Sequence, residues 1–175
     1  MAVVSNSVEI RCTPEEAFDY LSDHRSELEW NPGIESIDKL TDGPVGLGTK
    51  YRAKWKSAPK AVEVETTAYD RPHGWTVHNG GPVEVTVTIR LQPTAAGTRL
   101  SSDFDARPHG LFRLVFPLFL VKLRKEEAAN MTYLNTALER RAAAGQASEP
   151  GAAPPPGQTA PRREGRPPGS SGSPA

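Results

Sequence analysis

The chain has little cysteine, no long apolar run and no net charge, and each shortage excludes a class of protein. Cys12 is the one cysteine among 175 residues, so an intrachain disulfide is excluded and a reducing compartment suits the chain. The most apolar window, Leu111 to Leu123, has about 13 residues, whereas a bilayer span needs about 20. Lys and Arg balance Asp and Glu at 21 each, so no global field draws the chain to nucleic acid. The first residues lack the basic start and apolar run of a secretory signal, and we expect a cytoplasmic location.

Motifs that carry catalysis are also missing. The sequence contains no Gly-x-Ser-x-Gly, phosphate loop or dinucleotide fingerprint, and its four histidines have no metal-type spacing. We therefore expect no metal and no cofactor. His78 is the one histidine with a plausible inward position, whereas His24 follows Asp23 and is expected to help end a helix. Cys12 lies beside a helix start that lowers a thiol pKa, but burial as a small hydrophobe is the favoured interpretation.

Composition divides the chain in two. Residues 143–175 hold eight prolines and six glycines, and Thr159 is the one β-branched residue there. Such a segment buries too little apolar surface to offset an ordering cost of roughly 1 to 2 kcal/mol per residue. We predict one folded domain over residues 1–142 and a disordered tail over residues 143–175.

Helix signals lie at both ends of the domain. Thr13 and Glu16 form a capping box around Pro14, which predicts a helix start after an opening strand over residues 3–11. A second short helix is expected from Ser26 to Trp30, stopped by Asn31-Pro32-Gly33. A long helix is predicted from about His109 to Arg141, with Pro117 kinking it or marking its true start.

Alternating residues predict antiparallel strands between these helices. Residues 49–56 place Tyr51, Ala53 and Trp55 on one face and four cations on the other. Residues 61–70 place Val62, Val64, Thr66 and Ala68 inward, and Glu63 and Glu65 outward, opposite the lysines. The sheet therefore has one buried and one solvated face.

Hairpin registers test this assignment, because directly opposed residues share a face. A turn at residues 71–74 opposes Ala68 with Val77 and Thr66 with Asn79. A loop at residues 93–97 opposes Ile89 with Leu100, Val87 with Ser102 and Val85 with Phe104. At residues 79–82 an even loop buries His78 and Thr76, whereas an odd loop with a glycine bulge buries Trp75 and Val77, and we favour the odd loop.

Three stretches resemble the START-like, or SRPBCC, superfamily and its polyketide cyclase/dehydrase-type group. They are residues 8–23, from Val8-Glu9-Ile10 through the capping box to Asp23; Trp30-Asn31-Pro32-Gly33; and Gly97-Thr98-Arg99-Leu100 before the final strand and long helix. The resemblance implies an α+β helix-grip fold: a curved antiparallel sheet of about seven strands around a long C-terminal helix, with two short helices after strand 1. It also implies a deep hydrophobic cavity.

Inward positions of the strands, together with one face of the long helix, are the candidate ligand-binding residues. They are Tyr51, Trp55, Val64, Thr66, Trp75, Val77, Asn79, Val87, Ser102, Phe104, Phe112, Phe116 and Phe119. Among these, Thr66, Asn79 and Ser102 need hydrogen-bond partners, because an unpaired buried hydroxyl or amide costs roughly 1 to 3 kcal/mol. Water or backbone would satisfy them, and so would a ligand.

Three functions fit this pattern. The first is a non-catalytic carrier or sensor that binds a small hydrophobic molecule, such as a lipid or polyketide, as a monomer or weak homodimer. The second is a polyketide aromatase/cyclase or dehydratase in which a Tyr, Asn or His handles a proton. The third is an interaction module that uses the apolar Leu111 to Leu123 segment. With no acid/base pair apparent, we prefer the first.

Overall fold

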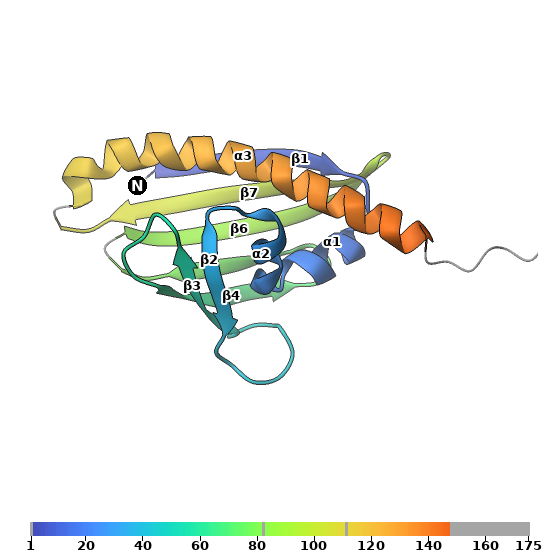
Figure 1. Cartoon of the computed structure of the whole chain (residues 1–175), viewed down its shortest axis with the longest axis horizontal. Helices are drawn as coiled ribbons and strands as arrows, with labels where there is room; N and C mark the ends of the chain where they lie inside the picture. Colours follow the sequence, from blue (N-terminus) through green and yellow to red (C-terminus); the bar gives the residue numbers. More distant parts are fainter. Residues whose placement is uncertain (1, 82, 111, 148–175) are drawn as a thin grey trace, which may run out of the picture.

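Seven antiparallel strands form one curved sheet in the computed structural model, which describes residues 2–81, 83–110 and 112–147 (Figure 1). The strand order is β1-β7-β6-β5-β4-β3-β2. The strands are β1 (Ala2–Ile10), β2 (Ile34–Lys39), β3 (Lys50–Trp55), β4 (Val62–Asp70), β5 (Gly74–Asn79), β6 (Val83–Thr94) and β7 (Gly97–Pro108). The helices are α1 (Pro14–Leu21), the 3-10 turn η1 (His24–Ser26), α2 (Glu27–Trp30) and α3 (Phe112–Ala147). The predicted helix-grip α+β fold is confirmed.

Helix α1 begins where the capping box predicts. The Thr13 backbone N–H donates to Glu16 Oε2 at 2.8 Å, and the Glu16 N–H donates to Thr13 Oγ1 at 3.2 Å. These two bonds satisfy backbone donors that a helix start leaves free. The second helix, α2, ends at Trp30 with Asn31 as its C-cap, as expected, and starts at Glu27, one residue after the predicted Ser26, because residues 24–26 form the separate 3-10 turn η1.

The terminal helix differs from its predicted bounds. It starts at Phe112 and runs to Ala147, so it includes residues 143–147 of the predicted tail. Pro117 lies inside it and does not mark its start. The rest of the predicted tail, residues 148–175, lies outside the described residues. No helix in the described part of the chain is long and apolar enough to cross a membrane.

The predicted register of β4 and β5 is wrong. Asp70 opposes Gly74, so the turn is one residue shorter than predicted and Ala68 opposes Thr76 in place of Val77. A bulge between Thr66 and Ala68 then inserts one extra residue into β4, so Thr66 opposes Val77 in place of Asn79. Because of the bulge, Ala68 lies on the outer face although Thr66 is inward, and Ala68 is exposed, while Tyr69 opposes Trp75.

The other two hairpins agree better with their predicted registers. In β5 and β6, Trp75 opposes Ile89 and Val77 opposes Val87, as an odd loop requires, and both β5 residues are buried. In β6 and β7 the inward residues are the predicted ones, but each partner is displaced by two, since Ile89 opposes Ser102 and Val87 opposes Phe104. A shift of two residues preserves the face, because side chains alternate with period two.

The packed core lies at the α1 end of the molecule. Phe18, fully buried, meets Tyr69 and Trp75 edge to face at ring-centroid distances of 4.9 and 5.4 Å. Leu134 and Leu138, in the second half of α3, are 2% and 4% exposed in the same cluster. This end of the sheet is therefore sealed by α1 and by the later turns of α3.

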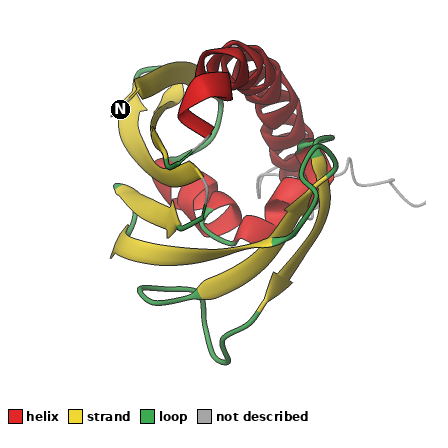
Figure 2. Ribbon diagram, turned by 90° about the vertical axis from the view of Figure 1, so that its left-hand side faces the viewer, coloured by secondary structure: helices red, strands yellow, loops and turns green. Residues whose placement is uncertain are grey.

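Helix α3 crosses the open side of the curved sheet. It packs on β1, β7 and α2, and in the end-on view the sheet forms an arc that the helices close into a ring (Figure 2). The middle strands, β4 to β6, face the inside of that ring. This arrangement decides which side chains can meet a bound molecule.

Candidate functional site

Two rows of opposed residues cross the concave face of the sheet. One row runs Trp75, Ile89, Ser102, Asn6 from β5 to β1. The neighbouring row runs Thr66, Val77, Val87, Phe104, Val4 from β4 to β1. Opposed residues project from the same face, so both rows point toward α3. These rows, with Tyr51 on β3 and Val85 on β6, are called the concave site below.

Apolar side chains in the middle of the concave site are incompletely covered. Val85, Val87 and Ile89 on β6 and Phe104 on β7 are all half-buried, although they lie on the inner face of central strands. Their remaining exposed surface faces inward, because strand neighbours cover their flanks. The side chains of the sheet and of α3 therefore leave accessible apolar surface here, in contrast to the packed α1 end.

Polar atoms of the concave site lack partners. Five buried atoms form no hydrogen bond within the described residues: Tyr51 OH, Thr66 Oγ1, Trp75 Nε1, Ser102 Oγ and Asn6 Nδ2. Folded proteins pair nearly all such groups, and each one left unpaired costs roughly 1 to 3 kcal/mol. Five on one face indicate a surface that needs a hydrogen-bonding molecule, either water or ligand.

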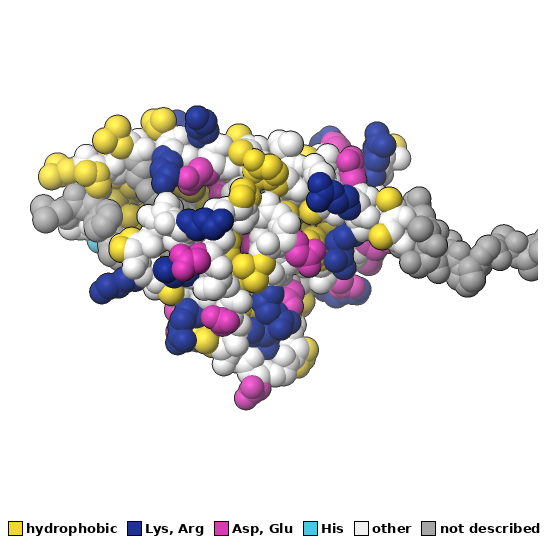
Figure 3. All heavy atoms as spheres, viewed as in Figure 1, with side chains coloured by type: hydrophobic (Ala, Val, Ile, Leu, Met, Phe, Trp, Pro, Cys, Tyr) yellow, Lys and Arg dark blue, Asp and Glu magenta, His cyan; other side chains and the backbone are white. Residues whose placement is uncertain are grey.

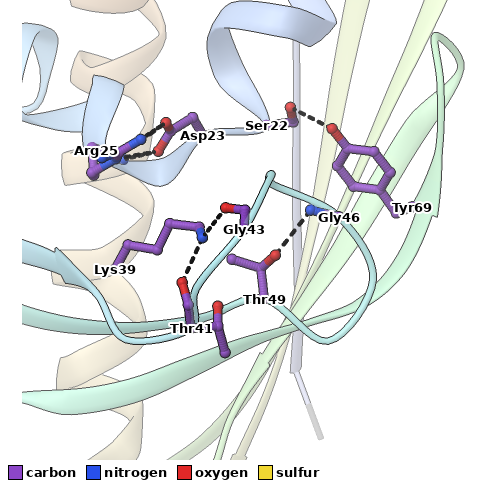
Figure 4. A network of polar contacts seen from close by, with 9 residues as sticks. All are labelled: Ser22, Asp23, Arg25, Lys39, Thr41, Gly43, Gly46, Thr49 and Tyr69. Carbon is purple, nitrogen blue, oxygen red and sulfur yellow. Dashed lines mark hydrogen bonds and ion pairs between the residues drawn. The ribbon is translucent and has the colours of Figure 1, made fainter.

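Several buried side chains outside the concave site do form hydrogen bonds within the described structure. Ser22, 3% exposed, lies 3.2 Å from the Tyr69 hydroxyl (Figure 4). In the same view Lys39 Nζ donates to the carbonyls of Thr41 and Gly43, at 2.6 and 2.7 Å, and holds the loop before β3. Outside the concave site, Ser26 Oγ, Trp30 Nε1, Asp105 Oδ1 and Asn135 Oδ1 also lack partners in the described structure, so the concave site is distinguished by having five such atoms on one face.

Tyr51 lies at the α2 end of the concave site. Burial, and then the negative charge of Asp23, raise the pKa of its phenol well above the ordinary range. The His24 backbone amide lowers this pKa by a smaller amount, because it lies near the Tyr51 hydroxyl without forming a hydrogen bond of good geometry. Asp23 forms an ion pair with Arg25, whose Nη2 lies 2.6 Å from Asp23 Oδ2 (Figure 4). The His24 ring meets the Tyr51 ring edge to face at 5.1 Å. Tyr51 is therefore a neutral hydrogen-bonding group at all ordinary pH values.

A second polar cluster joins η1 and α2 to α3. His24 Nδ1 and Glu27 Oε1 are 2.8 Å apart, and His24 Nε2 is buried without a partner in the described structure. Burial and the negative charge of Glu27 raise the pKa of Glu127, on α3, to about 7. Asn130 donates a long 3.5 Å bond to Glu127. The cluster can hold or release a proton near neutral pH.

Other candidate sites are weaker. Over the described ranges, no three His, Cys, Asp or Glu side chains gather as metal ligands do. A groove of about 230 Å³ lies near α2 and α3, lined by Leu28, Glu29, Trp30, Asn31, Pro32 and Tyr133. Burial, followed by the Glu16 charge, raises the pKa of the Cys12 thiol to about 11, so the helix start does not activate it.

Comparison of the sequence with known protein families identifies the family to which this fold and site belong. Residues 1–142 match the family model described as polyketide cyclase / dehydrase and lipid transport. The chain belongs to this family. The resemblance to the START-like superfamily is thereby confirmed, and the match covers every strand, α1, α2 and most of α3. A search of curated proteins found no match.

Solved structures share the family fold at low sequence identity. TTHA0849 from Thermus thermophilus aligns with a TM-score of 0.67 at 16% identity, over 80% of this chain and 99% of that one. The Zhui aromatase/cyclase from Streptomcyes sp. R1128 aligns at 0.64 and 16%, over 82% and 98%. Ara h 8.0201 aligns at 0.55 and 17%, over 76% and 97%. At these identities the likeness shows the fold alone.

Most of the predicted site residues of this family member lie on the concave face. Tyr51, Val64, Thr66, Trp75, Val77 and Ser102 are buried there, while Trp55, Val87 and Phe104 are half-buried. Phe116 is buried on α3, whereas the side chains of Phe112 and Phe119 lie outside the described part of the structure. Asn79 is at the strand end, and its amide makes a 3.5 Å bond to the Gly80 carbonyl.

Sequence reasoning missed the cluster around His24. His78 was expected to have the inward option, but its Nε2 lies 3.0 Å from Glu84 Oε1 on the outer face of the sheet. The mostly buried histidine is His24, whose side chain is 12% exposed. Glu127 was also missed. Two signals were available: Glu27 lies three residues after His24, and Glu127 falls on the buried side of the amphipathic half of α3.

Proposed function

We propose that this chain is a non-catalytic carrier or sensor that binds one small hydrophobic molecule between the sheet and α3. The observation that carries the proposal is the set of five unpaired polar atoms on the concave site, surrounded by half-buried apolar side chains. Apolar surface with a few placed polar groups is the usual composition of a small-molecule site. The ligand class is a mostly apolar molecule with several oxygen or nitrogen atoms, as in a lipid or a polyketide.

Filling the concave site tests the proposal. Val87→Trp places a large side chain on the inner face of β6, where Val87 is half-buried. Thr86→Trp is the matched control, because residue 86 projects from the opposite face of the same strand. Native mass spectrometry of protein purified from its own host detects any copurified molecule, and thermal shift across a lipid and polyketide panel ranks ligands.

We expect a copurified hydrophobic molecule with wild type and Thr86→Trp, and its loss with a folded Val87→Trp. Absence of any bound molecule, together with no thermal shift across the panel, contradicts the proposal. So does a ligand that binds Val87→Trp as tightly as wild type.

A second candidate function is polyketide cyclisation or dehydration. The polar cluster favours it, because His24 Nε2 is unpaired beside Tyr51 and Glu127 has a pKa of about 7. Such groups suit general acid/base steps on a substrate folded by the cavity. The family description includes cyclases, and the Zhui protein carries that name.

Turnover of a polyketide-like substrate separates the two functions. Tyr51→Phe and His24→Gln each lower turnover at least about tenfold if these side chains move protons. His78→Gln, at the outer pair with Glu84, is the control and leaves turnover unchanged. If all three variants turn over the substrate at the wild-type rate and still bind the ligand, the enzymatic function is excluded and only the carrier function remains.

The remaining parts of the proposal rest on the sequence. They are a cytoplasmic location, which suits a chain with one free cysteine, and a monomer or weak homodimer that does not bind nucleic acid. Localisation of a tagged full chain and sedimentation velocity test them.

A further inference from the structure

The first half of α3 turns an apolar stripe away from the protein. Leu114, Leu118 and Val121 are 80%, 76% and 67% exposed, and Val115 beside them is 51% exposed. At about 100° per residue, the first three lie within about 60° of one another around the helix. Phe116, 8% exposed, marks the opposite side, which faces the sheet. These four residues, Leu114, Val115, Leu118 and Val121, are called the outer stripe.

The charges around the outer stripe are of one sign. From Phe112 to Lys125 the helix carries Arg113, Lys122, Arg124 and Lys125 and no carboxylate. All four cations are exposed, and Lys122 and Lys125 follow the stripe on the same side of the helix. Glu126 is the nearest compensating group, 3.5 Å from Lys122. In the space-filling view, hydrophobic side chains protrude along this part of α3 with Lys and Arg beside them (Figure 3).

This charge pattern selects the partner. A second copy of the chain, docked stripe to stripe, would bring four cations against four cations, which is repulsive. The headgroups of an anionic bilayer complement the same cations, while the apolar stripe enters the boundary between headgroups and acyl chains. The stripe is far too short to span a bilayer, so contact is peripheral.

We propose that the outer stripe and its four cations dock the protein on the surface of an anionic lipid membrane. The contact orients the molecule, because α3 carries the stripe at the end opposite the packed α1 core (Figure 1). The inference goes beyond the proposed carrier function and holds or fails independently of it.

Vesicle sedimentation with matched variants tests the docking. Full-length protein is mixed with vesicles of phosphatidylcholine alone, or with added phosphatidylserine. Leu118→Asp places a charge in the outer stripe, and Leu47→Asp is the control, since Leu47 is 72% exposed in the loop before β3. Lys125→Gln removes a flanking cation, and Lys60→Gln, exposed before β4, is its control.

Wild type is expected to sediment with the serine-containing vesicles, less with phosphatidylcholine alone, and less as salt is raised. Leu118→Asp weakens binding at least about tenfold and Lys125→Gln about fivefold, while both controls bind as wild type. Failure of wild type to bind anionic vesicles overturns the proposal, as does equal loss in Leu47→Asp. Self-association of wild type that Leu118→Asp abolishes, without vesicle binding, assigns the stripe to a second copy and also overturns it.

Discussion

Threonines 66 and 98 give a matched pair of buried hydroxyls at the residue scale. Both are at most 1% exposed, but Thr98 Oγ1 donates to the Cys12 carbonyl at 2.7 Å, whereas Thr66 Oγ1 has no partner in the described structure. Thr→Val removes the hydroxyl at nearly constant shape. We expect Thr98→Val to lower the free energy of unfolding by about 1 to 2 kcal/mol, and Thr66→Val to leave it unchanged or raise it.

Denaturant titration of the ligand-free variants measures both effects. If the Thr66 hydroxyl contacts a ligand, Thr66→Val also weakens ligand binding about tenfold while the fold is at least as stable. Equal destabilisation by the two substitutions would show that Thr66 is satisfied within the protein.

Glu127 predicts a pH dependence of stability. Its pKa is raised from 4.5 to about 7 by burial, then by Glu27 and, more weakly, Glu126. The folded protein therefore holds this proton where the unfolded chain releases it, so its contribution is complete below about pH 4.5 and is lost as pH rises toward and through 7. The loss amounts to at most about 3 kcal/mol.

Glu127→Gln removes this titration. We expect its thermal midpoint to fall less than that of wild type between pH 5.5 and pH 8, because the amide stays neutral. Glu126→Gln, on the exposed neighbouring side chain, is the control and keeps most of the wild-type slope. Parallel pH profiles for wild type and Glu127→Gln would mean that Glu127 is ionised in the folded protein.

Gly97 shows at the element scale why a turn residue of the family motif is glycine. It starts β7 at φ +141°, and a Cβ there would lie 2.2 Å from the Ile10 carbonyl oxygen at the end of β1. Gly97→Ala must therefore move one strand relative to the other, and we expect a loss of more than about 2 kcal/mol. Gly46→Ala, with open space around its Cβ, is the control and changes stability little. Chemical denaturation compares them, and equal costs would contradict the strand contact.

Most strands in the sheet were predictable as elements, because alternation of apolar and polar residues reports which face is buried. The registers between neighbouring strands were less predictable. The extra residue between Thr66 and Ala68 leaves no mark in the pattern, since Thr67 is as acceptable in a strand as its neighbours. The bulge therefore escaped prediction, and with it the outward turn of Ala68.

Helix α3 divides the whole molecule into a packed end and an open end. Asn130, Leu134 and Leu138 in its second half are buried, whereas the outer stripe in its first half is exposed. Local opening follows the number of buried contacts. In the ligand-free protein we expect amides of residues 113–125 to exchange hydrogen at least about tenfold faster than those of residues 130–141.

Hydrogen exchange followed by mass spectrometry measures this gradient. Ligand or anionic vesicles should slow exchange in the first half of α3 and change the second half little. Uniform protection along α3 would show that the first half is as firmly packed as the second.

The sequence alone determined the element order, the capping of α1 and the inward side of most strands, because these depend on neighbours a few residues away. It also identified Tyr51, Thr66, Trp75 and Ser102 as residues of the concave face. Only the tertiary structure decided that their polar atoms lack partners, and that the charge of Glu27, on α2, acts on Glu127, on α3. Pairing and desolvation depend on groups about 100 residues apart in the chain, so no local pattern encodes them.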